Sequence, residues 1–256
     1  MIVPAERRRV LDLATVLVHR DLRLSYGGAA FGLLWAPATV LAQVAVLGFL
    51  FDRVVPLGID DYLTFLLSGL LVWHLVSSAL NGSTGAFTAN RDLVRRPGFP
   101  DAVLPLVTVG RAAAGYALAL PVLLVAVAVT GRLAVTALAL PVILLATLVL
   151  LGGPAYVVAV LNVRHRDVDH LTRVLLGIAF YATPVFYPEE RLPDGWAWLS
   201  DLNPFAAVVT LHRQVLYSGE WPSAGRLLAL AAWAVAGLAV AGVVHRRSAW
   251  RLADDL

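Results

Sequence analysis

The sequence predicts an all-α integral membrane protein with six transmembrane helices. Hydrophobic residues make up 59% of the 256 residues and charged residues only 14%, and the mean hydropathy is +0.78. These values lie far from those of soluble domains. In addition, long apolar runs nearly free of charge are separated by short charged segments, which is the pattern of helices that cross a bilayer repeatedly.

Six segments are close to the roughly 20 apolar residues that a bilayer-spanning helix needs. They are residues 31–51, 62–86, 103–129, 134–161, 171–187 and 227–244. If the amino terminus is cytoplasmic, fifteen of the twenty arginines fall in inside segments and five in outside segments. Positive charge prefers the cytoplasmic side, so we expect a multi-pass membrane protein with both termini in the cytoplasm.

An amphipathic helix is expected before the first span, over residues 5–26. Arg8, Asp12, Thr15, His19 and Arg23 recur at steps of three or four, with apolar residues on the opposite face. A helix of this kind suits the cytoplasmic membrane interface; an ordinary helix packed on another part of the protein is the alternative. The glycine-containing stretch 26–35 then turns the chain into the membrane.

A short cytoplasmic helix is expected in "NRDLVRRPGFP", residues 90–100. Asn90 is a favourable N-cap, and Pro97 disfavours helix at Arg96, so the helix should run from Asn90 to Arg96. A solvated positively charged loop is the alternative. His165, Asp167, Asp169 and His170 form a second cytoplasmic cluster, but the interleaved arginines would repel a cation, so we expect no metal site there.

Segment 188–222 lies outside the membrane in this topology. Its apolar run, residues 205–217, is too short to span and favours a pair of short re-entrant or interfacial helices above a cavity. Aromatic residues gather nearby and either form an interfacial belt or line a path for sugar rings. They are Phe180, Tyr181, Phe186, Tyr187, Trp196 and Trp198.

Several chemistries are excluded by composition. The chain has no lysine, so it lacks the phosphate-binding loop of Walker ATPases, and it has no cysteine for thiol chemistry. None of the six segments contains a carboxylate, which argues against a membrane-embedded enzyme of lipid-linked sugar metabolism. His74 is interpreted as a helix-packing residue, while Arg111 either reaches back to the cytoplasmic surface or faces a wet pathway.

Five stretches together resemble the ABC type-2 permeases that export lipid-linked polysaccharides, of O-antigen, galactan or teichoic acid type. They are "RDLRLSYGGAAFGLLWAPATVL", "NRDLVRRPGFPDAVLP", "VRHRDVDHL", "YATPVFYPEERLP" and "LNPFAAVVTLHRQVLYSG". The resemblance covers the whole chain, 1–256, as one permease domain. Ala30 and Phe31 depart from the serine-leucine pair that many members carry.

The resemblance implies a location in the bacterial inner membrane. It also implies a homodimer with two copies of a separate ATPase, which carry ATP and Mg, and no nucleic acid partner. It implies that segment 188–222 forms external gate helices, with the six aromatic residues above along the glycan path. A lipid diphosphate would enter at Arg20, Arg23 and Tyr26. The contact with the ATPase is assigned to Asn90, Arg91, Asp92, Leu93, Val94, Arg95, Arg96 and Phe99. A type-2 exporter of a drug or simple lipid, and a scaffold subunit without transport, are the alternatives.

Overall fold

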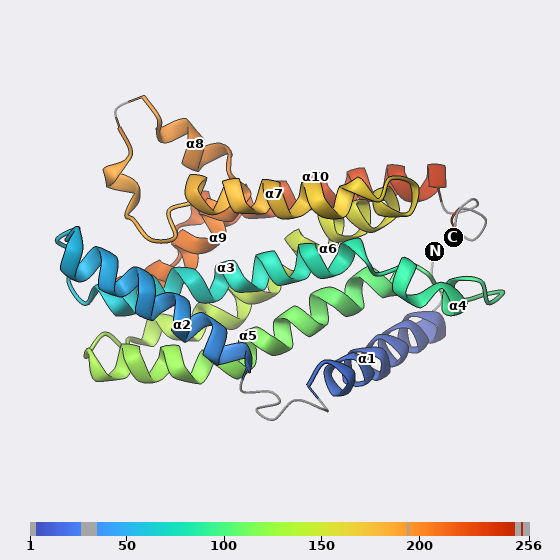
Figure 1. Cartoon of the computed structure of the whole chain (residues 1–256), viewed down its shortest axis with the longest axis horizontal. Helices are drawn as coiled ribbons and strands as arrows, with labels where there is room; N and C mark the ends of the chain where they lie inside the picture. Colours follow the sequence, from blue (N-terminus) through green and yellow to red (C-terminus); the bar gives the residue numbers. More distant parts are fainter. Residues whose placement is uncertain (1–3, 27–34, 194, 249–251, 253–256) are drawn as a thin grey trace.

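The computed structural model describes residues 4–26, 35–193, 195–248 and 252, and within them it contains helices and no strands. The long helices lie roughly along one direction (Figure 1). The α-helices are α1 (Pro4–Tyr26), α2 (Trp35–Phe49), α3 (Tyr62–Thr84), α4 (Arg91–Val94), α5 (Val103–Val129), α6 (Leu140–Arg164), α7 (Asp167–Ala182), α8 (Ala197–Leu202), α9 (Pro204–Arg213) and α10 (Ala224–Ser248).

Five helical segments among the described residues are long and apolar enough to cross a membrane. They are Pro37–Val54, Tyr62–Thr84, Val103–Val129, Val135–Arg164 and Ala224–Ser248. The segment predicted as the fifth of six spans, 171–187, corresponds to α7, which has 16 residues and ends at Ala182. Pro184 follows two residues later and cannot continue a helix, so α7 is shorter than the apolar run that predicted it.

The central helix of the bundle is α3, which lies between α2, α5, α6 and α7 (Figure 1). In its membrane-length window 78% of the residues are buried, against 17% in α2 and 17% in α10. A helix that is apolar on all sides is expected in such a buried position. The peripheral helices expose large aliphatic side chains, such as Val46, Val125 and Val235, as helices facing lipid do.

Two ends of the bundle carry the polar segments. The end that holds α4, the start of α5 and the α6–α7 turn is called the α4 end, and the opposite end, with α8 and the start of α10, is called the α8 end (Figure 1). A large apolar core fills the middle and the α8 end, and a second cluster around Phe87 fills the α4 end. Candidate functional residues lie at both ends.

Candidate functional site

Four of the eight coupling residues predicted at the α4 end, Arg91–Val94, form the helix α4, which ends at Val94 and not at Arg96. The prediction that Asn90 caps this helix is wrong, because its side chain accepts no hydrogen bond from the helix backbone. Asn90 Nδ2 instead donates to the Ala86 carbonyl (3.0 Å), and Asn90 Oδ1 accepts from Arg20 Nη2 (2.8 Å). The asparagine therefore ties this segment to α1.

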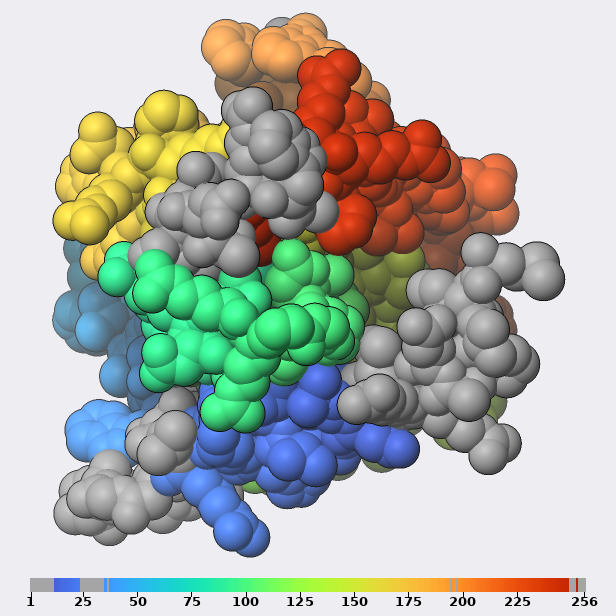
Figure 2. All heavy atoms as spheres, turned by 90° about the vertical axis from the view of Figure 1, so that its right-hand side faces the viewer, coloured from blue at the N-terminus to red at the C-terminus, as the bar shows by residue number. Residues whose placement is uncertain are grey.

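The predicted contact residues differ in how far they are buried. Arg91, Asp92, Arg95 and Arg96 are exposed, Leu93 and Phe99 are half-buried, and Val94 is buried in the apolar cluster around Phe87. Figure 2 looks at this end and shows the α4 segment, in green, beside α1, in blue. The charged side chains are thus available to a partner, whereas Val94 anchors the segment to the bundle.

Helix α1 packs against α5 through the buried Leu17, as the alternative interpretation of this helix allows. Arg20 donates to Asp21 Oδ1 (Nε 3.0 Å, Nη2 2.9 Å) and also to Asn90, so its guanidinium connects α1 to the α4 segment. Together with Thr15, Val16 and His19, Arg20 and Arg23 line a hollow of about 550 Å³ on α1. Charged groups are therefore gathered beside a partly apolar surface.

Of the predicted entrance residues, Arg20 and Arg23 lie on the hollow, and Tyr26 is the last residue of α1. The side chain of Tyr26, and the glycine-containing turn with Ala30 and Phe31, lie outside the described residues.

A polar network that sequence reasoning missed joins α3, α6 and α7 at the α4 end. Asn162 Nδ2 donates to the Thr84 carbonyl (2.9 Å), and its Oδ1 accepts from the Asp169 backbone N–H (3.1 Å). The Thr84 hydroxyl donates to Asp169 (2.7 Å), which also pairs with Arg173. The hydrogen bond from Thr84 is the main cause that holds the pKa of Asp169 below its usual value, with Arg173 adding to it. The carboxylate of Asp169 thus fastens α7 to α3.

At the α8 end, segment 188–222 contains the one-turn helix Glu189–Arg191, then α8 and α9. Asn203 begins α9 by accepting from the Phe205 backbone N–H (2.9 Å), which satisfies a free donor of the first turn. α9 continues as a π-helix, Gln214–Ser218, to Gly219, whose φ of +70° is accessible to glycine at little cost. The chain then enters α10.

Glu189 holds the short helices of this end together. Its carboxylate accepts from both Nη atoms of Arg226 (3.0 Å for Nη1 to Oε1), from Ser200 of α8 and from Thr210 of α9 (3.2 Å). Burial raises the pKa of Glu189, but these hydrogen bonds and the Arg226 charge outweigh it and bring the pKa below its usual value. Glu189 is therefore an ionised hub that links α8, α9 and α10.

Arg213 lies in segment 188–222, which the predicted topology places outside, but only 7% of the residue is exposed. Its Nη1 donates to the Pro184 carbonyl (2.8 Å) and its Nη2 to the Val185 carbonyl (2.9 Å), while the guanidinium lies 3.6 Å from the centre of the Phe65 ring. A Cβ on Gly69 would stand 2.6 Å from the Val185 oxygen, so only glycine lets the loop approach α3 this closely. Arg213 therefore pins the α7–α8 loop to the central helix.

The predicted aromatic residues form two separate groups. Phe180, Tyr181, Phe186 and Tyr187 contact one another with ring centroids 5.0–6.0 Å apart. Trp196 and Trp198 stack on each other at 6.3 Å, and both are 53% exposed. Sequence reasoning missed two further members of the first group, Phe51, which stacks on Phe186 at 5.4 Å, and Trp73, which lies 5.7 Å from Phe180.

Comparison with known proteins gives a consistent picture over most of the chain. Residues 13–217 match the family model described as ABC-2 type transporter. The chain is 31% identical to the O-antigen export system permease protein RfbA of Myxococcus xanthus, over 94% of both chains. It is 27% identical to the protein of that name from Klebsiella pneumoniae, over 82% of both, and 27% identical to the polysialic acid transport protein KpsM of Escherichia coli, over 79% of this chain and 80% of the relative.

Proposed function

The chain belongs to the ABC-2 type transporter family, and on this premise we propose that it is the membrane-spanning subunit of an exporter of lipid-linked polysaccharide. The observation that carries the proposal is its similarity, over 94% of both chains, to a permease named for O-antigen export. The five apolar helices agree with a multi-pass membrane protein. The chain itself is a transporter subunit and not an enzyme.

We further propose that α7 also crosses the membrane, as the fifth in chain order of six spans in a single permease domain, 1–256. Its 16 residues give about 24 Å of helix at 1.5 Å per residue, which is less than the roughly 30 Å of a hydrocarbon core. The non-helical stretch after Ala182 completes the crossing. Irregular backbone at this depth needs protein around it, and Arg213, together with Gly69 of α3, supplies that cover.

In this topology the α4 end faces the cytoplasm of a bacterial cell whose inner membrane holds the protein, and the α8 end faces outward. Two copies of the chain pair around a path for the glycan, and two ATPase chains, which carry ATP and Mg, dock at the α4 segments. The exposed charges of Arg91, Asp92, Arg95 and Arg96 support this docking surface. Because Arg20 bonds to Asn90, movement of the α4 segment would also move α1.

The entrance and the exit of the path follow from the same arrangement. The hollow on α1 is the proposed entrance for the lipid diphosphate. Arg20 already bonds to Asp21 and Asn90, whereas Arg23 has no hydrogen bond or ion pair with any described residue. Segment 188–222 is the proposed gate. The exposed face of Tyr181, with 69% of the residue accessible, supports contact of this aromatic group with sugar rings.

Copurification tests the proposal. A tagged chain purified from its native membrane should bring an ABC ATPase down with it, and lipid-linked glycan in proteoliposomes should stimulate ATP hydrolysis by the complex. Absence of any ATPase from the purified complex would refute the energy-coupled role. Stimulation by drugs or simple lipids, but not by lipid-linked glycans, would show that the substrate class is wrong while the transporter assignment stands.

A further inference from the structure

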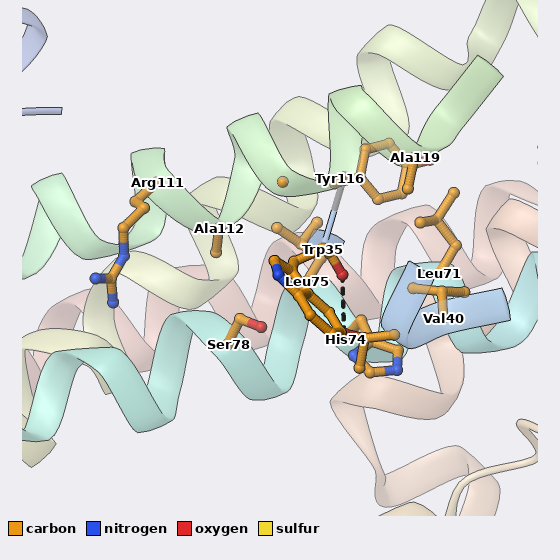
Figure 3. Close-up of a pocket in the computed structure, with 12 residues that line it drawn as sticks. Trp35, Val40, Leu71, His74, Leu75, Ser78, Arg111, Ala112, Tyr116 and Ala119 are labelled. Carbon is orange, nitrogen blue, oxygen red and sulfur yellow. Dashed lines mark hydrogen bonds between the residues drawn. The ribbon is translucent and has the colours of Figure 1, made fainter. Parts of the chain in front are cut away.

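A cavity of about 350 Å³ lies between α2, α3 and α5, apart from the hollow on α1 and the gate segment (Figure 3). Its walls combine polar side chains, among them His74, Ser78 and Arg111, with apolar ones such as Leu71 and Leu75. The volume falls within the range of small-ligand pockets. An ionisable side chain inside a membrane bundle is costly, and its presence there points to a functional site.

Two of the polar groups in this cavity lack partners within the described part of the chain. Arg111, on α5, makes no hydrogen bond or ion pair with any residue that the structure describes. Tyr116, one turn further along α5, is only 3% exposed, and its hydroxyl is buried without a hydrogen-bond partner. His74, by contrast, already bonds to Gln43 (2.9 Å). The missing partners of Arg111 and Tyr116 indicate an external ligand.

The position of the guanidinium fixes the depth of that ligand. Arg111 is eight residues from the start of α5, about 12 Å along the helix axis. Its side chain lies against α3 at Gly82, where a Cβ would stand 2.7 Å from Nη2, and α3 ends two residues later at Thr84. The charge therefore lies level with the last turn of α3, near the depth of lipid headgroups.

The rest of the cavity extends toward the middle of the bundle. Tyr116 lies about 7.5 Å deeper than Arg111 along α5, and the walls beside it are apolar, formed by Val40, Leu71 and Ala119. A cation near headgroup depth with an apolar extension below it matches a molecule that has a charged head and a hydrocarbon tail. A free hydrophilic anion would leave the apolar part of the cavity unused.

We propose that this cavity binds the phosphate group of an amphiphile in the leaflet at the α4 end. The planar guanidinium of Arg111 offers paired N–H donors that match phosphate oxygens. The Tyr116 hydroxyl donates to an oxygen between the phosphate and the hydrocarbon chain, and the apolar walls cover the first methylene groups of that chain. The phosphate comes either from an anionic phospholipid of the bilayer or from a polyprenyl diphosphate.

The site does not depend on the proposed export function, because binding is measured without an ATPase and without transport. The full chain in detergent is examined by native mass spectrometry while it is titrated with phosphatidylglycerol, polyprenyl diphosphate or the uncharged lipid diacylglycerol. The two phosphate lipids distinguish the two sources. We expect at least one of them to bind at one equivalent per chain and more tightly than diacylglycerol.

Substitutions then test whether the lipid binds in this cavity. Arg111→Gln should weaken binding of the phosphate lipid about tenfold, as expected for a hydrogen bond to a charged group, and Arg111→Lys should restore part of it. Tyr116→Phe should cause a smaller loss. Arg53→Gln is the matched control, because Arg53 carries the same charge on an exposed side chain outside the cavity, and it should bind as the unmodified chain does.

Three results would overturn the site. They are equal binding of diacylglycerol, unchanged binding after Arg111→Gln, and, in a further titration with inorganic phosphate, binding of that phosphate but of neither phosphate lipid. If Arg111→Gln does not yield a monodisperse protein, the affinity for the phosphate lipid is measured for Arg111→Lys and for Tyr116→Phe instead. Wild-type affinity in both variants would refute the proposal. Stronger binding of phosphatidylglycerol than of polyprenyl diphosphate would identify a bilayer lipid, and the reverse order would identify a cargo lipid.

Discussion

Replacement of Arg213 should loosen the loop between α7 and α8. Arg213→Gln shortens the side chain and removes two hydrogen bonds from a charged group, to the carbonyls of Pro184 and Val185. Each such bond contributes about 1.5–3 kcal/mol, and the contact with the Phe65 ring adds about 0.5–2 kcal/mol. Removing the buried charge also removes its desolvation cost. We therefore expect a net loss of about 3 kcal/mol.

The loss is measured by heating the purified chain in detergent and determining the remaining folded fraction by size-exclusion chromatography at each temperature. At about 2–4 °C per kcal/mol for a chain of this size, Arg213→Gln should lower the midpoint by roughly 6–12 °C. Arg213→Lys should lower the unfolding midpoint less than Arg213→Gln does but should not restore it fully, because an ammonium lacks the planar guanidinium geometry that reaches two carbonyls. Arg191→Gln is the control: Arg191 donates to the Leu57 carbonyl (2.8 Å) but is exposed. Equal midpoints for Arg213→Gln and Arg191→Gln would refute the reasoning.

Three further outcomes are expected. Arg20→Gln should reduce the rate of ATP hydrolysis at saturating glycan more than Arg23→Gln does, because of the two arginines only Arg20 bonds to the described α4 segment; equal rates at saturating glycan would contradict the link, and copurification of the ATPase is the control for assembly. Reversing the charge of Arg95 and Arg96 together should weaken the copurified complex with the ATPase while membrane insertion persists, and an intact, fully active complex would exclude the docking assignment. The stabilisation from Glu189 should be complete above the unfolded carboxyl pKa of about 4.3. It should decline as the pH falls through the pKa of Glu189 in the folded protein, which is lower. Glu189→Gln should remove this acid dependence in a plot of the unfolding midpoint against pH.

The sequence predicted the helices well where one physical property decides them. Apolar runs of membrane length predicted the five long helices, with ends that differ by a few residues, as for 62–86 against Tyr62–Thr84. The exception is α7, because the apolar run continues past Ala182 into a proline-containing loop. Hydropathy predicts whether a residue lies in an apolar environment, but it does not predict where the backbone stops being helical.

The polar contacts could not be predicted, because they join residues that are far apart in the chain. Arg20 and Asn90 are 70 positions apart, and Thr84 and Asp169 are 85 apart. Asn90 has the residue type of an N-cap. Its side-chain oxygen instead accepts a hydrogen bond from the charged Arg20 of α1, so it does not cap the helix. Local propensity sets what a side chain can do, and the tertiary neighbours decide which of these options it takes.

The two ends of α7 are both fastened to α3, and this constrains how motion can pass through the bundle. At the α4 end, the Thr84 hydroxyl and Asn162 hold Asp169. At the α8 end, Arg213 holds the loop after α7 against Gly69 of α3. Sliding α7 along α3 would break the hydrogen bond between Thr84 and Asp169 at one end and would disturb the close packing of Val185 on Gly69 at the other. Rearrangement that begins at the α4 segment is therefore less costly if α3 and α7 move as one body, and the gate segment attached to them then moves with the same body.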